Sequence, residues 1–337
     1  MRMFFCLSLS TYPMETNIAN MNGKSEDNVD QMTIPRHIVV SGGGPSLFTI
    51  FGAVKCLVDK ELIDPGLLKS IHACSSGAFI GLFLCVAKLG MSFEELALYI
   101  ISRCWNTLFA NEVLDFRTMF NAKGLFDSTI IKKAISPLLL TVGLAPTTTL
   151  ANLFDVTGID LVLYAVDINS KPLKKVKLSH KTYPDMKVYE ALTITMGLPG
   201  VMTPTFIDDM CLVDGGLMAN YPYTDCIEDS GDKKEEIIGF KIKWEKPKLP
   251  IDSLSNMFTF LAHLTKMMAD HIDTSSRELP DGHNTVECHA PNSGNPSQWL
   301  DLFGDSDTRA TYIEAGAQSA NEFIAKRTQQ TQQESHT

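Results

Sequence analysis

Residues 36–62, RHIVVSGGGPSLFTIFGAVKCLVDKEL, combine an apolar run, three consecutive glycines and a longer amphipathic segment. The run before the glycines has the composition of a buried strand. After the glycines, apolar residues recur at helical spacing, so that they share one face. The stretch therefore predicts a strand, a tight loop and a helix in immediate succession. The predicted apolar face consists of Leu47, Ile50, Phe51, Val54, Leu57 and Val58.

A second unit of the same kind follows at residues 70–89, SIHACSSGAFIGLFLCVAKL. Its first five residues read as a strand, and Ser76 to Leu89 read as a helix that is apolar on most faces. Such a helix is expected in the middle of a domain. Ser92 and Glu95 then form a capping-box pattern, which predicts a third helix that runs to about Phe109.

Farther along the chain, IDLVLYAVDI (159–168) and EIIGFKIKW (236–244) have the composition of central strands. Two amphipathic segments, 254–272 and 307–326, predict helices that cover the sheet. Strands that alternate with helices indicate an α/β domain with a largely parallel sheet.

The chain has 337 residues, 45% of them hydrophobic, which is enough for a substantial core. Residues 1–32 are polar over most of their length and predict a mobile leader, and residues 327–337 predict a polar tail that frays. No repeat and no Gly/Ser/Pro linker divides the part between them. We therefore expect a single domain over residues 33–326.

The formal charge of −10 and a pI near 5.3 argue against binding to nucleic acid, which requires a basic face. The eight cysteines form no CxxC pair and read as buried thiols in a reducing compartment, so a cytoplasmic location is expected. The opening MRMFFCLSLSTYP leaves secretion as the alternative. The longest apolar run, 77–87, is too short to span a bilayer.

Ser75 stands between the strand and the helix of the second unit, in ACSSG. This setting matches a nucleophile elbow, a strained turn that exposes Oγ above the edge of the sheet. The residues around the serine must be small, as Ala73 and Gly77 are. The alternative is that Ser75 or Ser76 caps the following helix.

Gly42, Gly43 and Gly44 form the loop of the first unit, where their amides can turn toward one point. A phosphate-binding P-loop is excluded because no lysine follows before Lys55, and a dinucleotide fingerprint because Leu47 replaces the last glycine. An oxyanion hole is the favoured interpretation. A glycine turn chosen for tight packing is the alternative.

Asp214 ends a short apolar strand in CLVDGGLMANYP, and Gly215 and Gly216 follow it. The glycines allow a turn that holds the carboxylate close to other backbone. A carboxylate acts as a base near neutral pH only when burial raises its pKa. An ordinary Asp-Gly hairpin turn is the alternative.

The glycine loop, Ser75 and Asp214 follow one another along the chain in this order, and together they resemble the patatin-like phospholipase family of lipid acyl hydrolases. The similarity extends through GLFDSTIIKKAI (124–135) and EALTITMGLPGVMTPTFID (190–208) and covers about residues 36 to 325. It implies a three-layer α/β/α fold with a central, mostly parallel sheet. Ser46 and Leu47 stand where the family usually has Lys or Arg followed by Gly, so the loop conformation can differ.

The resemblance also implies a mechanism in which Ser75 and Asp214 form a catalytic dyad without histidine and the loop of Gly42, Gly43 and Gly44 holds the oxyanion. It implies hydrolysis of phospholipid or related esters through an acyl-serine, with no metal and no cofactor. Transient contact with a membrane surface is expected. Two alternatives stay open, a carboxylesterase for smaller or neutral lipid esters and a binding module that has lost turnover.

Other candidate features favour structural interpretations. His72 is expected to point away from Ser75, and Asp208 and Asp209 are expected to be solvated. His263 and His271 lack a third ligand for a metal site.

Six lysines and one acid lie between residues 171 and 187, which indicates a solvated surface or, alternatively, a surface for anionic headgroups. The stretch AISPLLLTVGLAP (134–146) is either core or an exposed lip for acyl chains.

Overall fold

The computed structural model describes residues 33–110, 116–231, 233–243, 251–253, 255, 257–273, 279, 283–291 and 302–334. The leader predicted for residues 1–32 lies outside these residues, as do residues 335–337 of the predicted tail. The domain boundary at residue 33 stays a prediction.

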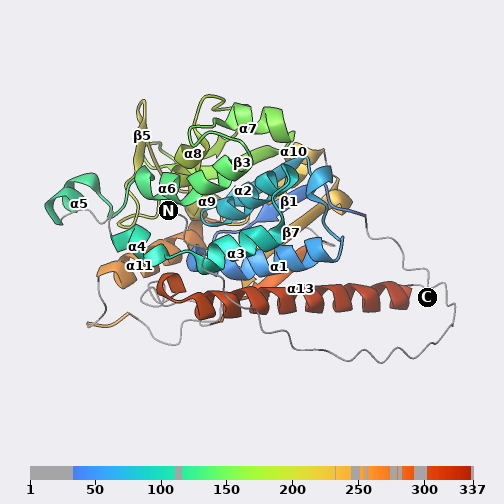
Figure 1. The fold of residues 1–337 in the computed structure, drawn as a ribbon. Helices are drawn as coiled ribbons and strands as arrows, with labels where there is room; N and C mark the ends of the chain where they lie inside the picture. The colour runs from blue at the N-terminus through green and yellow to red at the C-terminus, as the bar shows by residue number, and fades with distance from the viewer. Residues whose placement is uncertain are drawn as a thin grey trace, which may run out of the picture. The chain divides into compact units, whose positions relative to one another are not determined.

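The described part of the chain forms one eight-stranded sheet with the order β5-β6-β3-β2-β1-β7-β8, and β4 pairs with β3 (Figure 1). The five strands β3, β2, β1, β7 and β8 are mutually parallel, and β4, β5 and β6 are joined by antiparallel pairings. The prediction of a central, mostly parallel sheet is confirmed. The strands are β1 His37–Val40, β2 Ser70–Cys74, β3 Asp160–Asp167, β4 Lys174–Leu178, β5 Thr205–Ile207, β6 Met210–Asp214, β7 Ile237–Lys243 and β8 Thr285–His289.

The two strand–loop–helix units are present as predicted. The first consists of β1, the short 3-10 helix η1 (Gly44–Ser46) and α1 (Leu47–Asp59). The second consists of β2 and α2 (Gly77–Lys88), which is buried along nearly its whole length. Because β1 and β2 are parallel neighbours, both loops lie at the same edge of the sheet.

Alternating side chains along the strands divide the core into two layers. Ile38 and Val40 of β1 face the main cluster, which α1 and α2 share, whereas Val39 faces a cluster with Tyr221 and Tyr223. On β3, Val166 likewise faces the second side. Helices α9 (Gly216–Ala219), α10 (Tyr223–Ser230) and α11 (Met257–Ile272) cover that side. The three-layer α/β/α prediction is therefore confirmed.

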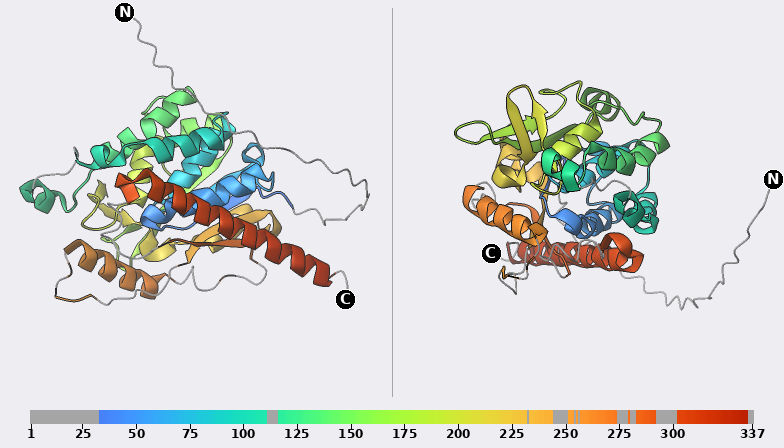
Figure 2. Two further views of the ribbon diagram at one scale, coloured as in Figure 1. Left: turned by 60° about the horizontal axis from the view of Figure 1, so that its bottom comes forward. Right: turned by 90° about the vertical axis from the view of Figure 1, so that its left-hand side faces the viewer.

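The two late helices are also present, as α11 and α13 (Ser306–Glu334). Helix α13 lies along α1 in all views (Figure 2). The predicted end near Lys326 was wrong, because the helix continues to Glu334. The extra residues are mainly Gln, Arg, Thr and Glu, and neither Gly nor Pro interrupts them.

The predicted third helix was right at its start and wrong at its end. α3 (Phe93–Ser102) begins at the Ser92–Glu95 capping box but stops before Arg103, whose backbone is extended. A separate helix, α4 (Trp105–Ala110), follows. The Arg309 guanidinium donates to the carbonyl oxygens of Ile101 and Arg103, so contacts from α13 hold the break open.

Further helices of the described residues flank the main cluster or connect the strands. Among them are α5 (Phe116–Ala122), α6 (Ser128–Thr141), α7 (Leu150–Thr157), α8 (Val188–Thr195) and the short 3-10 helices η2 (Pro65–Leu67) and η3 (Lys234–Glu236). Among the described residues, none of the helices combines the length and the apolar character that crossing a membrane would require.

Candidate active site

The topology brings the ends of two strands together. β2 runs parallel to β3 and ends at Cys74, which pairs with Tyr164. β6 runs antiparallel to β3 and ends at Asp214, which pairs with Ala165. Since the two partners are consecutive residues of β3, the chain leaves β2 and β6 at neighbouring points. Ser75 and Asp214 meet there although they are 139 residues apart in sequence.

Ser75 occupies a sharp turn with a φ of 49°, in the left-handed region that a serine rarely adopts. Its Oγ donates a hydrogen bond of 2.7 Å to Oδ2 of Asp214. Gly77 is required here, because a Cβ at this position would lie 2.6 Å from the carbonyl oxygen of Ser41. The alternative that Ser75 or Ser76 caps α2 is wrong, since neither side chain accepts from an amide of that helix.

The Asp214 carboxylate is buried, with 6% of the residue exposed. Its Oδ1 accepts from the Gly216 amide at 2.7 Å, and its Oδ2 accepts from Ser75. Burial raises the pKa of Asp214 to about 6, and the two hydrogen bonds oppose this shift. The hairpin-turn alternative is wrong, because β6 leads into helix α9. A buried carboxylate that receives a serine proton donor is positioned to act as a base.

Thr195 forms a hydrogen bond to the backbone of Ser75, and the sequence did not predict this role. Its Oγ1 accepts from the Ser75 amide at 3.0 Å and donates to the Tyr164 carbonyl oxygen at 2.6 Å. The side chain is fully buried. Thr195 thus joins the elbow to β3. No local pattern marks a threonine at the end of a helix as a partner of a residue that lies 120 positions earlier.

The glycine loop lies directly against Ser75. A Cβ on Gly42 would be 2.9 Å from the Cβ of Ser75. The Gly42 amide donates to the Asn220 carbonyl oxygen at 3.1 Å, and the Gly43 amide donates to Ser76 Oγ at 3.2 Å. The Gly44 amide donates to no described residue. The oxyanion-hole assignment of this loop stays a prediction.

Asn220 links the glycine loop to Asp273, the residue that follows α11. Its carbonyl accepts from Gly42, and its own amide donates to Oδ2 of the buried Asp273 at 3.1 Å. The Asn220 side chain also borders both Gly42 and Gly216. Asn220 follows the Asp214 turn in the chain, so it connects both halves of the candidate site.

His72 lies outside the site, as the sequence analysis expected. It is fully buried, and its Nδ1 is 2.7 Å from the Tyr164 hydroxyl. Burial lowers its pKa to about 4. His263 and His271 lie on α11, and no cluster of three His, Cys, Asp or Glu side chains that could hold a metal occurs in the part of the chain that is described.

Three of the six lysines of the lysine-rich segment are paired with carboxylates within the molecule, which favours the structural interpretation for those three. Lys175 and Lys177 bind Asp225 and Asp229 of α10, and Lys181 binds Asp160. Of the stretch 134–146, most of the residues up to Leu139 are buried in α6, whereas Leu140 is exposed.

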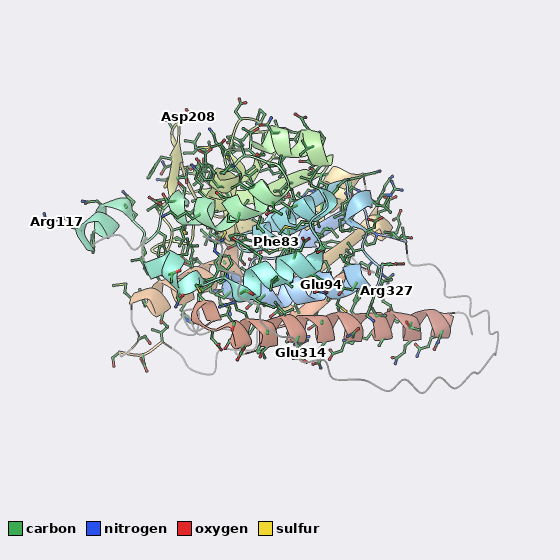
Figure 3. The ribbon with its side chains drawn as sticks, in the orientation of Figure 1. Phe83, Glu94, Arg117, Asp208, Glu314 and Arg327 are labelled. Carbon is green, nitrogen blue, oxygen red and sulfur yellow. The ribbon has the colours of Figure 1, made fainter. Side chains whose placement is uncertain are left out.

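Asp208 and Asp209 are exposed, as expected, and Figure 3 shows Asp208 at the far end of the β5–β6 hairpin. The described cysteines form no disulfide. The prediction that all cysteines are buried was wrong for Cys104, which is exposed just beyond the end of α3.

The sequence profile of a family described as "Patatin-like phospholipase" matches residues 38–227 of this chain. The match contains the glycine loop, Ser75 and Asp214. No curated protein sequence matches the chain at a significant level.

Solved structures with similar coordinates include VipD from Legionella pneumophila, with a TM-score of 0.49 and 12% identity over 87% of this chain and 67% of VipD. Full-length ExoU from Pseudomonas aeruginosa, solved with SpcU, gives a TM-score of 0.44 and 14% identity over 88% of this chain and 53% of the matched chain. This chain thus spans about two thirds of the length of VipD and about half of that of ExoU.

Proposed function

This chain belongs to the patatin-like phospholipase family, and from that premise we propose that it hydrolyses fatty-acyl esters of phospholipids with Ser75 as nucleophile and Asp214 as base. The observation that carries the proposal is the 2.7 Å hydrogen bond from Ser75 Oγ to the buried Asp214 carboxylate. A base of pKa about 6 is ionised at neutral pH and still accepts a proton readily.

The first half of the reaction acylates the serine. Ser75 Oγ attacks the ester carbonyl carbon while its proton passes to Asp214 Oδ2. The carbonyl oxygen becomes an oxyanion, and the Gly44 amide, which donates to no described residue, is the donor of the Gly42–Gly44 loop that is available to stabilise it. The tetrahedral intermediate collapses, the bond to the alcohol oxygen breaks, and the alcohol leaves with the proton from Asp214.

In the second half of the reaction, water hydrolyses the acyl-serine. The oxygen of the water molecule attacks the acyl carbon while Asp214 takes a proton from that water. The second tetrahedral intermediate then expels Ser75 Oγ, which recovers the proton from Asp214. The products are a fatty acid and the alcohol portion of the lipid. In the described part of the chain, no histidine hydrogen-bonds Ser75 or Asp214, which supports a dyad rather than a triad.

A fluorophosphonate probe tests the assignment directly, because it reacts with activated serines. We expect the wild-type chain to be labelled and Ser75→Ala to be unlabelled, with ester hydrolysis lowered on the order of 10⁴-fold or more. Ser230→Ala, at the end of α10, is the matched control and should label normally. A folded wild-type protein that reacts with no probe would favour a binding module instead.

Ester chain length separates the phospholipase from the alternative carboxylesterase. A phospholipase should hydrolyse long-chain phospholipid in vesicles faster than a short-chain soluble ester at equal concentration. The reverse preference would assign the same dyad to smaller or neutral esters.

A further inference from the structure

Helix α11 presents an apolar face to solvent. Five of its large apolar side chains are between 44 and 69% exposed. Their spacings of three and four residues place them on one side of the helix. We call this set the α11 stripe; it consists of Met257, Phe260, Leu264, Met267 and Met268.

Packing of α11 against the domain does not explain the stripe, because other residues make those contacts. Ala269 packs against the cluster of Val166, Val213 and Leu217. Leu261 lies against Gly200, where an added Cβ would be 2.7 Å from its Cδ1. The helix therefore carries apolar side chains that pack on the domain and, in the α11 stripe, apolar side chains that are exposed to solvent. An outward apolar helix face of this kind is typical of a surface that binds an apolar partner.

Helix α11, which carries the α11 stripe, is linked to the candidate active site through α9 and Asp273. The helix packs on α9, which begins directly after the turn that holds Asp214. Asp273, the residue after α11, accepts the amide of Asn220, and the Asn220 carbonyl accepts the amide of Gly42. Two hydrogen bonds thus connect the end of this helix to the glycine loop beside Ser75.

We propose that the α11 stripe inserts into the surface of a lipid aggregate and places the candidate site against the substrate layer. This inference rests on the proposed function, since a lipid ester that stays in a bilayer can react only if the enzyme binds that bilayer beside the site. A lipid surface fits a helix that lies flat with Phe, Leu and Met outward. A net charge of −10 gives no general attraction to anionic headgroups. Binding should therefore occur on neutral vesicles and persist at high salt.

Cosedimentation with phosphatidylcholine vesicles tests the α11 stripe. The full chain carrying Ser75→Ala is used, so that turnover does not alter the vesicles. Phe260→Ser and Leu264→Ser, added singly to this chain, should each weaken binding about tenfold, because each removes a large side chain from the apolar layer. Leu98→Ser is the matched control, since Leu98 is 67% exposed on α3, and it should bind unchanged.

Three results would overturn the inference. They are no binding to phosphatidylcholine vesicles, binding that requires phosphatidylserine and disappears at high salt, and equal binding by the α11 variants and the control. Dimers that depend on Phe260 and Leu264 in the absence of vesicle binding would assign the stripe to a second copy of the chain. Urea unfolding of each variant verifies that it is folded.

The proposed function can fail separately. If the wild-type chain hydrolyses no ester while the Ser75→Ala chain binds vesicles through the α11 stripe, the hydrolase assignment is wrong and the lipid-binding role of the stripe holds. If the wild-type chain hydrolyses phospholipid but substitutions in the α11 stripe do not change its vesicle binding, the lipid-binding role of the stripe is wrong and the hydrolase assignment holds.

Discussion

Ser75 is held in a backbone conformation that costs on the order of 1–2 kcal/mol for a residue with a Cβ. The surroundings hold it in place. Thr195 accepts its amide, and Gly77 lets the following helix approach the backbone of Ser41. The strain turns Oγ toward Asp214, so the residues that fix the turn also fix the geometry of the proposed dyad.

Thr195→Val tests this support. Valine has nearly the same shape but leaves the Ser75 amide and the Tyr164 carbonyl oxygen without their partner. An unsatisfied buried group costs about 1–3 kcal/mol. We expect kcat for a soluble ester to fall about tenfold or more with little change in KM, because the substitution shifts Ser75 and leaves the other residues of the candidate site in place.

Thr195→Ser is the matched control, since it keeps the hydroxyl and should restore most of kcat. If Thr195→Val keeps the wild-type kcat while Thr195→Ser lowers it, packing of the methyl group rather than the hydrogen bonds positions Ser75. Steady-state kinetics of the three proteins decide between these roles.

The pKa of Asp214 predicts the pH dependence of the reaction. Burial raises this pKa from 3.8 to about 6, so the carboxylate is protonated, and inactive as a base, below that pH. For a soluble ester, kcat/KM should fall about tenfold per pH unit below pH 6 and level off above it. A rate that is constant down to pH 4 would contradict the role of Asp214 as base.

The same shift has the opposite effect on stability. A folded-state pKa above the unfolded one stabilises the protein fully below pH 3.8, and this contribution is lost as the pH rises through about 6. Asp214→Asn should remove this part of the pH dependence. Urea unfolding across this range measures the difference between the two proteins.

At the scale of elements, α1 and α13 approach each other so closely that only glycine fits at the contact. A Cβ on Gly52 would lie 1.9 Å from the Ile313 carbonyl oxygen, and one on Gly316 would lie 1.8 Å from that of Thr49. The long helix α13 therefore presses its backbone onto the helix that follows the glycine loop. This contact positions α1, and the glycine loop beside Ser75 directly precedes that helix.

Gly316→Ala should thus destabilise the protein by about 1–3 kcal/mol, although alanine favours helices. Gly304→Ala is the matched control, because a Cβ there meets no atom within 4 Å, and its effect should stay within about 0.5 kcal/mol. Equal free energies of unfolding for the two variants would show that the helices can separate without loss.

At the scale of the whole molecule, the sheet brings distant segments together. The parallel order of β1, β2 and β3 places the glycine loop and Ser75 at one edge of the sheet. The antiparallel strand β6 brings Asp214, which lies 139 residues after Ser75, to the same edge. Helix α11 then lies beside this edge through α9 and Asp273. The strand order therefore brings the residues of the candidate site together, and the packing of α11 on α9 places the helix with the α11 stripe beside them.

The sequence by itself determined the elements and the candidate residues, because strand composition, helical periodicity and glycine turns are local properties of the chain. It predicted both strand–loop–helix units, the late helices, and Ser75, Asp214 and the Gly42–Gly44 loop as candidates. It did not determine Thr195, the break after α3, the partners of the Gly42 and Gly43 amides or the outward face of α11. These depend on which segments become neighbours in space, and that follows from strand pairing and helix packing over more than a hundred residues, which no local pattern encodes.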